Sequence, residues 1–389
     1  MRNLKTLTLL LIAIGLDEAY NSSIIESSGN FSQLTKALIS TLLFGAQVIF
    51  SPIQAGISDF RSRKKGLIIA FFVTSISLSL LLCDSKSRYF ISFLIIAACL
   101  KGIGGNIIPI SRAVLADSIK HNFRFAIGLT TSSIAAGYIF IAVISQFFNS
   151  FYVPMELLIT TLVVLILILI FFLDRFDSIA QVANRSLRIE IIENVKSIYE
   201  DFLKDKIFFM SSLSYYFWEV SFYLVFIKDV ELRSKNFENF SIPMCVGYLL
   251  GVLSLKLINK WHDQHVLRFG YRISTVSVIT IFIASIFGVQ YSYYVSILAY
   301  VVFSFGYGFF IPCLFSMISK VRQPHEQGKI YGLIDSVDTI AFATALLFGV
   351  FILNFKLIMV ISFLFLIIGI LIYHLSKKHW SVHEEKLKS

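Results

Sequence analysis

Long apolar segments dominate this sequence and recur along its whole length. About 20 mainly apolar residues are enough for a helix to cross the hydrocarbon core of a bilayer. In lipid, only helices and closed barrels satisfy all of their backbone hydrogen bonds, and runs of this length favour helices. The sequence therefore predicts an all-α membrane protein with twelve transmembrane helices. The predicted spans are Thr6–Ile25, Leu34–Ile57, Leu67–Leu82, Tyr89–Ile110, Phe125–Phe147, Val153–Leu173, Ile207–Ile227, Ile242–Ile258, Ile273–Val289, Tyr293–Ile318, Ile330–Leu353 and Leu357–His374.

The composition excludes several classes of protein. Charged residues make up 15% of the 389 positions, whereas a soluble domain holds about 25%. The net charge of +10 would suit nucleic acid, but the basic residues are spread over short loops. The four cysteines lie in or beside apolar runs without a CxxC pair, which argues against a metal site. We expect a monomer with a lipid bilayer and a small molecule as partners, without nucleic acid and without a cofactor beyond a coupling proton.

The basic residues also predict how the chain is oriented. Cytoplasmic loops of membrane proteins carry an excess of lysine and arginine. With both termini placed in the cytoplasm, most of the 34 Lys and Arg residues fall on that side, among them Arg112 in the loop after the fourth span. The many Ile, Phe, Lys and Asn residues are typical of an AT-rich bacterial genome. The expected location is therefore a bacterial inner membrane.

A drop in hydrophobicity divides the chain into two halves. Between Asp174 and Lys206, apolar residues recur at helical spacing among charged ones, which predicts an amphipathic helix on the inner membrane surface. The predicted organisation is a six-helix bundle over 1–175, a cytoplasmic linker over 176–206, a second six-helix bundle over 207–376 and a cytoplasmic tail over 377–389.

The loop between the second and third spans carries the densest positive charge in the sequence. It contains Gly56, Asp59, Arg61 and Arg63, followed by Lys64, Lys65 and Gly66. This order resembles the loop signature between helices 2 and 3 of the major facilitator superfamily. Arg124–Leu129 also echoes Gly328–Leu333, as expected of transporters built from repeats. The resemblance implies two six-helix bundles related by pseudo-symmetry, and a gating role for Gly56, Asp59, Arg61 and Arg63.

Two departures from the family pattern bear on activity. Lys101 lies in the fourth span, where the family often has an arginine about one turn before a glycine. Lys101 would hold an anionic group of the substrate or an intramembrane acid, and the alternative is a fixed ion pair or a side chain that reaches the interface. The fifth span contains Gly128 and Gly137 but no Gly-Pro pair. Drug–proton antiporters of the superfamily usually carry that pair, so its absence disfavours drug efflux.

Acidic residues within the spans are the strongest candidates for function. An ionisable side chain costs about 2.5–3.5 kcal/mol at the centre of a membrane helix. Asp17 and Glu18 lie near the middle of the first span, with Asn21 about one turn on, and Glu219 lies in the seventh. The resemblance implies that these two spans flank a central cavity. One hypothesis is a carboxylate that exchanges a proton as the cavity changes sides. The alternative is that lysines such as Lys101 pair with these acids and lock helices together.

Two further groups complete the predicted site. Asp335 and Asp338 are expected near the cytoplasmic start of the eleventh span. There they would either interact with the helix dipole or pair with basic loop residues as part of a gate. Tyr215, Trp218 and Tyr307 come from aromatic clusters. They would stack on a substrate or hold a cation over their rings, and the alternative is ordinary packing in a membrane protein rich in phenylalanine.

Together these features predict a secondary active transporter that moves a small organic solute by alternating access, in the uptake direction and coupled to protons. The alternatives are proton-driven efflux of drugs or a siderophore, and a membrane sensor that does not transport. The sequence has no GxxxxGK[ST] loop for ATP and no HExxH, GxSxG or CxxC motif. We therefore expect neither an enzyme nor an ATP-driven pump.

Overall fold

The computed structural model describes residues 2–27, 33–60, 62–82, 89–119, 122–147, 200, 202–233, 238–287, 292–321, 326–352 and 354–388. Three predictions lie outside these residues. They are the sixth span Val153–Leu173, most of the amphipathic linker helix, and the gating residue Arg61.

The described residues are almost entirely helical. The helices are α1 (Arg2–Ser27), α2 (Gln33–Phe60), α3 (Arg63–Leu81), α4 (Phe90–Gly104), α5 (Ile107–Ser118), α6 (Phe123–Phe147), α9 (Lys206–Arg233), α10 (Glu238–Ser254), α11 (Asp263–Phe287), α12 (Ser292–Val321), α13 (Gln327–Phe351) and α14 (Phe355–Lys388). Seven helical segments of the described chain are long and apolar enough to cross a membrane. Each predicted span within the described residues coincides with one helix, except the fourth, which is the pair α4 and α5.

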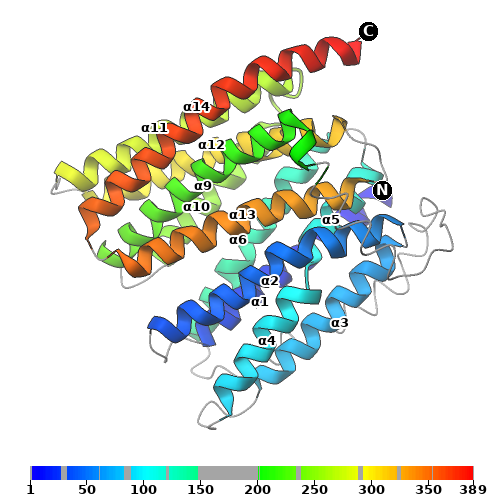
Figure 1. The fold of residues 1–389 in the computed structure, drawn as a ribbon, viewed down its shortest axis with the longest axis vertical. Helices are drawn as coiled ribbons and strands as arrows, with labels where there is room; N and C mark the ends of the chain where they lie inside the picture. The colour runs from blue at the N-terminus through cyan, green and yellow to red at the C-terminus, as the bar shows by residue number, and fades with distance from the viewer. Residues whose placement is uncertain are drawn as a thin grey trace.

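The helices form two groups, one from each half of the sequence (Figure 1). In the N-terminal group, α1 packs against α6, and α4 packs against α2 and α3. In the C-terminal group, α9 packs against α14, and α12 packs against α10 and α11. One apolar core lies mainly in each group. The first includes Phe71 and Leu94, and the second includes Phe303 and Ile311 and extends to Ile127 of α6. The two chain ends lie at the same end of the molecule (Figure 1), as expected for an even number of spans.

The two groups meet along α2 and α13, and where α6 contacts α10 and α12. Figure 1 shows α13 running beside α2 at the boundary between the groups. Both contacts are close because a glycine faces the partner helix. A Cβ added at Gly332 of α13 would lie 2.5 Å from the Cα of Pro52, and one at Gly128 of α6 would lie 2.8 Å from Val252. Gly128 and Gly332 are matching positions of the two sequence echoes, so they occupy corresponding contacts between the halves.

The fourth span is interrupted near its middle. α4 ends at Gly104 and α5 begins at Ile107. Gln54 of α2 satisfies the backbone groups that the break exposes. Its side-chain nitrogen donates to the carbonyl of Gly104 at 2.6 Å, and its oxygen accepts from the N–H of Asn106 at 3.2 Å. The break therefore costs little in hydrogen bonding, and the span continues beyond it.

Two predicted helix ends were placed too early. α5 continues to Ser118, so Arg112 does not lie in a loop but is buried within the helix. The predicted span ended just before Arg112 because of its charge, whereas here the counter-charge comes from Asp335 on a helix distant in the sequence. At the other end of the chain, α14 passes the predicted end at His374 and reaches Lys388. Most of the predicted tail is therefore a continuation of the last helix.

Candidate functional site

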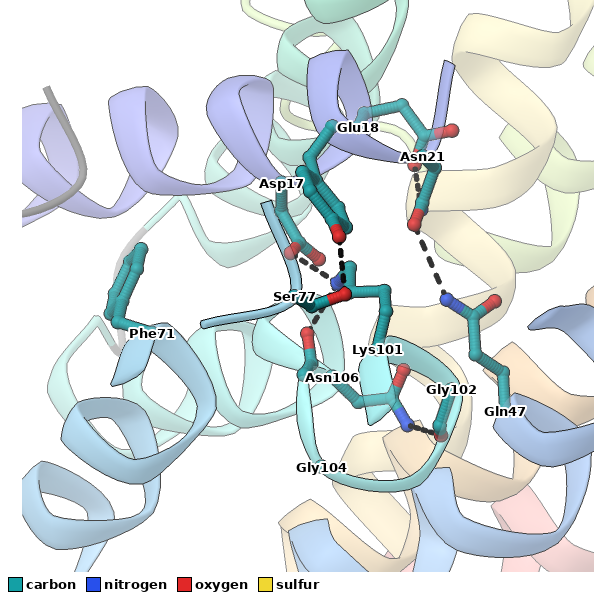
Figure 2. A network of polar contacts seen from close by, with 12 residues as sticks. Asp17, Glu18, Asn21, Gln47, Phe71, Ser77, Lys101, Gly102, Gly104 and Asn106 are labelled. Atoms are coloured by element: carbon teal, nitrogen blue, oxygen red, sulfur yellow. Dashed lines mark hydrogen bonds and ion pairs between the residues drawn. The ribbon is translucent and has the colours of Figure 1, made fainter. Parts of the chain in front are cut away.

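A buried ion pair joins α1 to α4 in the N-terminal half (Figure 2). The Nζ of Lys101 lies 2.5 Å from Oδ1 of Asp17, and it also donates to the carbonyl oxygen of Gly105. Lys101 has no exposed surface, and Asp17 is 2% exposed. This arrangement is the helix-locking alternative that the sequence left open for Asp17. Because Lys101 already has an acid as its partner, an anionic ligand would have to displace Asp17.

Glu18 belongs to a separate chain of hydrogen-bonded polar side chains. Neighbouring helical residues are turned about 100° from each other, so Glu18 points away from Asp17. Its Oε2 accepts a hydrogen bond from Nδ2 of Asn21 at 3.2 Å, and Nε2 of Gln47 on α2 donates to Oδ1 of Asn21 at 3.5 Å (right side of Figure 2). All three side chains are buried. Gln47 was not among the predicted site residues, although an amide within an apolar span was an available signal.

Tyr20 and Ser77 hold three helices around the ion pair. The Tyr20 hydroxyl of α1 lies 2.5 Å from the Ser77 hydroxyl of α3, which donates to the carbonyl of Ala97 on α4 at 2.6 Å. The Nζ of Lys101 also lies 5.6 Å from the centre of the Tyr20 ring. These contacts fix the position of Lys101 relative to α1 and α3.

Two carboxylates and three tyrosines form a polar cluster that joins α9, α12 and α13. The Tyr307 hydroxyl donates to Oε1 of Glu219 at 2.5 Å and lies 3.2 Å from the Tyr215 hydroxyl. Tyr215 and Tyr223 both donate to Oδ1 of Asp338, at 3.2 and 3.3 Å. Within the described part of the chain, neither carboxylate forms an ion pair with a lysine or arginine. We call these five residues the tyrosine–carboxylate cluster.

Trp218 packs against this cluster and is fully buried. Its ring stacks on that of Tyr307, with centroids 5.6 Å apart and planes 7° apart, and on that of Phe303, with centroids 5.1 Å apart. Such stacking limits the orientations that the Tyr307 side chain can adopt. The three aromatic residues predicted for the site therefore have different surroundings. Tyr215 and Tyr307 direct hydroxyls into the cluster, whereas Trp218 belongs to the packed core.

A third polar contact crosses from one half to the other. Nη1 of Arg112 on α5 lies 3.9 Å from Oδ1 of Asp335 on α13, and Ser51 of α2 donates to Oδ2 of Asp335 at 3.0 Å. Arg112 also donates to the hydroxyls of Thr130 and Thr131 on α6. Asp335 of the C-terminal half is thus held by two side chains of the N-terminal half.

Asp335 and Asp338 lie deeper in their helix than predicted. α13 begins at Gln327, so the two acids fall in its third and fourth turns. The dipole of a helix acts within its first turn, and the predicted interaction with it is therefore wrong. Arg112 was also not among the predicted site residues. The apolar run Ala113–Leu115 that follows it was the available signal that the span continued.

Two of the predicted gating residues, Asp59 and Arg63, meet the start of α13. The two carboxylate oxygens of Asp59 accept from the backbone N–H of Gly328 at 2.9 Å and from that of the next residue at 2.8 Å. Arg63 forms an ion pair with Asp59, and its Nε lies 3.1 Å from Oδ2 of Asp117. An acidic group is favourable at a helix N-terminus. Asp59 thus joins the two halves at the end of the molecule where α2 passes into α3, which we call the basic-loop end.

The other two gating candidates are Gly56 and Arg61. Gly56 is buried in the last turn of α2, one turn before Asp59. Arg61 lies outside the described residues, so its proposed role in gating stays a prediction.

A second contact at the basic-loop end was missed by the sequence analysis. Oδ1 of Asp263, at the start of α11, lies 2.8 Å from Nη1 of Arg124 on α6, and its Oδ2 lies 2.5 Å from Nζ of Lys320. Arg124 also donates to the carbonyls of Asn259 and Trp261. The signal was the position of Asp263 where the chain enters α11, since α10 and α11 are the counterparts of α2 and α3. We call the two contacts, Asp59 with α13 and Arg124 with Asp263, the two latches.

The sequence was compared with models of protein families. The model of the Major Facilitator Superfamily matches residues 6–346. The chain belongs to the major facilitator superfamily. This result confirms the family that the loop signature of Gly56, Asp59 and Arg63 indicated. Among curated proteins, the sequence has no significant match.

Solved structures of this superfamily share the fold at low sequence identity. The human organic anion transporter MFSD10 (TETRAN) is similar with a TM-score of 0.73 and 13% identity, over 95% of this chain and 99% of its own. The proton:xylose symporter XylE bound to 6-bromo-6-deoxy-D-glucose is similar with a TM-score of 0.70 and 13% identity, over 97% of this chain and 95% of its own. At this identity the likeness shows the fold alone.

Family membership establishes the general properties of the protein. It is a multi-pass membrane protein with the twelve-span, two-bundle fold, and a transporter rather than an enzyme. The boundaries proposed for the two bundles, the roles of individual site residues and the identity of the solute stay predictions.

Proposed function

We propose that this chain takes up a small organic solute across a bacterial inner membrane by alternating access, driven by protons. Membership of the superfamily supports transport. The observation that carries proton coupling is Glu219. It is 1% exposed and is held by the Tyr307 hydroxyl, without a lysine or arginine partner among the described residues. The absence of a Gly-Pro pair from α6 supports uptake over drug efflux.

The latches support the alternating-access step. Positive charge collects in cytoplasmic loops, so the basic-loop end is the proposed cytoplasmic end, with both termini on that side. Asp59 and Arg124 belong to the N-terminal half, and their partners at Gly328 and Asp263 belong to the C-terminal half. Access from the cytoplasm therefore requires both latches to break. This arrangement fits a transporter whose two bundles rock around a central site.

Glu219 is the proposed proton carrier. Burying an ionised carboxylate without a cationic partner is costly, so this group gains free energy by binding a proton when the site is closed to water. The Tyr307 hydroxyl is able to donate to the ionised form and accept from the protonated form, which preserves the hydrogen bond in both states. Asp17 is already neutralised by Lys101, and we assign that pair a structural role. Glu18, which accepts from Asn21, is the second candidate.

Replacement of the two acids tests the coupling. A solute is first found by screening for thermal stabilisation of the purified protein. In proteoliposomes with an internal pH-sensitive dye, addition of that solute to the wild-type protein is expected to move protons inward. Glu219→Gln removes the titratable group but keeps an acceptor for Tyr307, so solute-dependent proton movement should fall to the level of empty liposomes. Glu18→Gln tests the second candidate in the same assay.

Glu200→Gln is the matched control, because Glu200 lies on the surface beside Lys204 and should leave proton movement unchanged. Normal proton movement in both Glu18→Gln and Glu219→Gln would remove these acids from the mechanism. Outward movement of the solute against its gradient would instead indicate proton-driven efflux of drugs or a siderophore. Binding without any flux would indicate a sensor.

A further inference from the structure

We infer that the solute is an organic cation such as a protonated amine, and that Asp338 binds it while Glu219 carries the proton. This inference rests on the proposed function and specifies its substrate class. It comes from a difference between three carboxylates of α9 and α13, Glu219, Asp335 and Asp338, in the groups that contact them.

Asp338 is the carboxylate that is ready to accept a ligand. Both oxygens of Asp335 have partners, because Ser51 donates to one and Arg112 lies against the other. The two tyrosines that donate to Asp338 both reach Oδ1. No described residue donates to its Oδ2, and the side chain is partly exposed. A carboxylate oxygen that accepts no hydrogen bond from the described residues is a favourable place for a positively charged donor.

Among the described residues, the two basic side chains nearest to the candidate site, Lys101 and Arg112, already have acidic partners. Lys101 is held by Asp17 and by the carbonyl of Gly105. Arg112, the guanidinium that faces this region from α5, lies against Asp335 and two threonine hydroxyls. An anionic solute would have to displace one of these acids. A cation instead meets Asp338, whose partners are neutral hydroxyls, so the local charge balance favours a cation.

Aromatic rings lie next to the same carboxylate. Tyr223, which donates to Asp338, packs edge-on against Phe342 at 5.1 Å, and Phe342 lies one turn after Asp338 on α13. Phe44 of α2 packs edge-on against Phe342 at 5.0 Å, so rings from both halves meet there. An organic cation over a ring face gains about 0.5–1 kcal/mol at exposed sites and more when it loses water.

The tyrosine–carboxylate cluster also provides separate positions for the coupling proton and for the positively charged solute. Glu219 is buried, whereas Asp338 is partly exposed, and Tyr307 and Tyr215 lie between them. Two carboxylates allow a proton to reside on Glu219 while an amine occupies Asp338. Simultaneous binding of both is what co-transport in one direction requires, whereas a single shared carboxylate would force exchange.

Thermal unfolding of the purified full-length protein tests the charge of the solute. The probes are phenethylamine and tetraethylammonium as cations, with 3-phenylpropanoate and 2-phenylethanol as anionic and neutral molecules of similar size to phenethylamine. At least one cation is expected to raise Tm in a concentration-dependent way. The anion and the alcohol are expected to leave Tm unchanged.

Variants then locate the cation. Asp338→Asn should weaken cation binding about tenfold or more, the loss expected when a charged partner is removed. Asp338→Glu retains the charge and should keep part of the stabilisation, which guards against loss of fold as the explanation. Glu219→Gln should still bind the cation although it loses proton coupling, and Glu200→Gln is the control for a carboxylate-to-amide change.

Three results would overturn the inference: stabilisation by the anion but by neither cation, stabilisation by none of the four probes, or equal cation stabilisation in the wild type and Asp338→Asn. The proposed transport function is tested separately from this cation site. If proteoliposomes move a neutral or anionic solute together with protons, transport is retained and the cation site is rejected.

Discussion

Acidic residues within the membrane spans of this protein have two different kinds of partner. Asp17 and Asp335 lie against the cations Lys101 and Arg112, whereas Glu219 and Asp338 accept hydrogen bonds from tyrosines. A carboxylate paired with a cation has little to gain from a proton or a positively charged ligand. A carboxylate held only by hydroxyls does gain from either, so we assign the chemistry of transport to the second kind.

The structural role of the Asp17–Lys101 pair predicts a loss of stability on breaking it. Asp17→Asn or Lys101→Gln alone leaves one buried charge without a partner, which costs about 3–5 kcal/mol. The double variant Asp17→Asn with Lys101→Gln should lose less than the two single changes together, because no charge remains. Thermal unfolding of the purified variants measures the loss of stability in the single and double variants. Single variants as stable as the wild type would contradict a structural role for the pair.

Helix contacts set how closely the two halves approach. α2 and α13 touch where Gly332 lies over Pro52, and α6 touches α10 where Gly128 lies over Val252. Small residues allow helix backbones in membranes to pack closely. The same positions also control which state is favoured, since any added volume there separates the halves.

We predict that Gly332→Ala weakens the closed arrangement of the basic-loop end. The added Cβ would lie 2.5 Å from backbone of Pro52, so α13 must move away from α2. Spin labels on Lys65→Cys and Lys260→Cys, which are exposed at that end of each half, report the separation in a background without the four native cysteines. Longer label distances are expected.

Gly45→Ala is the matched control on α2, because a Cβ there meets nothing within 4 Å. It should leave the distance distribution unchanged. An identical distribution for Gly332→Ala and the wild type would show that this contact does not limit opening.

At the scale of the whole molecule, the two latches join the halves at two places. Asp59 ties the α2–α3 turn to the start of α13, and Arg124 of α6 reaches Asp263 at the start of α11. The two latches involve corresponding helices of each half, as pseudo-symmetry implies. Since both hold the basic-loop end shut, the closed state should depend on their combined strength.

Loss of either latch should therefore populate the open state. Asp59→Asn and Arg124→Gln each remove hydrogen bonds to a charged group, worth about 1.5–3 kcal/mol, so each should shift the ratio of closed to open molecules about tenfold to a hundredfold. The double variant should shift it further, because the latches share no residues. The same pair of spin labels measures these populations. A double variant that opens no more than either single one would indicate that the latches act as one unit.

Much of the fold could be predicted because the bilayer acts on local sequence. Apolar runs such as Ile330–Leu353 become spans whatever their neighbours, and the basic loop around Arg63 must lie in water. The order of Gly56, Asp59 and Arg63 indicated the family, which the family model confirms. The misplaced end of the fourth span shows where local reasoning fails. Arg112 is tolerated inside the span because a residue on another helix lies against it.

The sequence alone thus determined the membrane class, the spans, the family and the acids and tyrosines worth testing. Only the tertiary structure decided which of them meet. Lys101 pairs with Asp17, which is 84 positions away in the sequence, and Glu219 accepts a hydrogen bond from Tyr307, which is 88 positions away. Ser51 and Asp335, which form a hydrogen bond, are 284 positions apart. Insertion into lipid depends on each segment's own composition, whereas the partner of a buried charge depends on how all the helices pack. That packing separates a neutralised acid from one that is free to bind a proton or a cation.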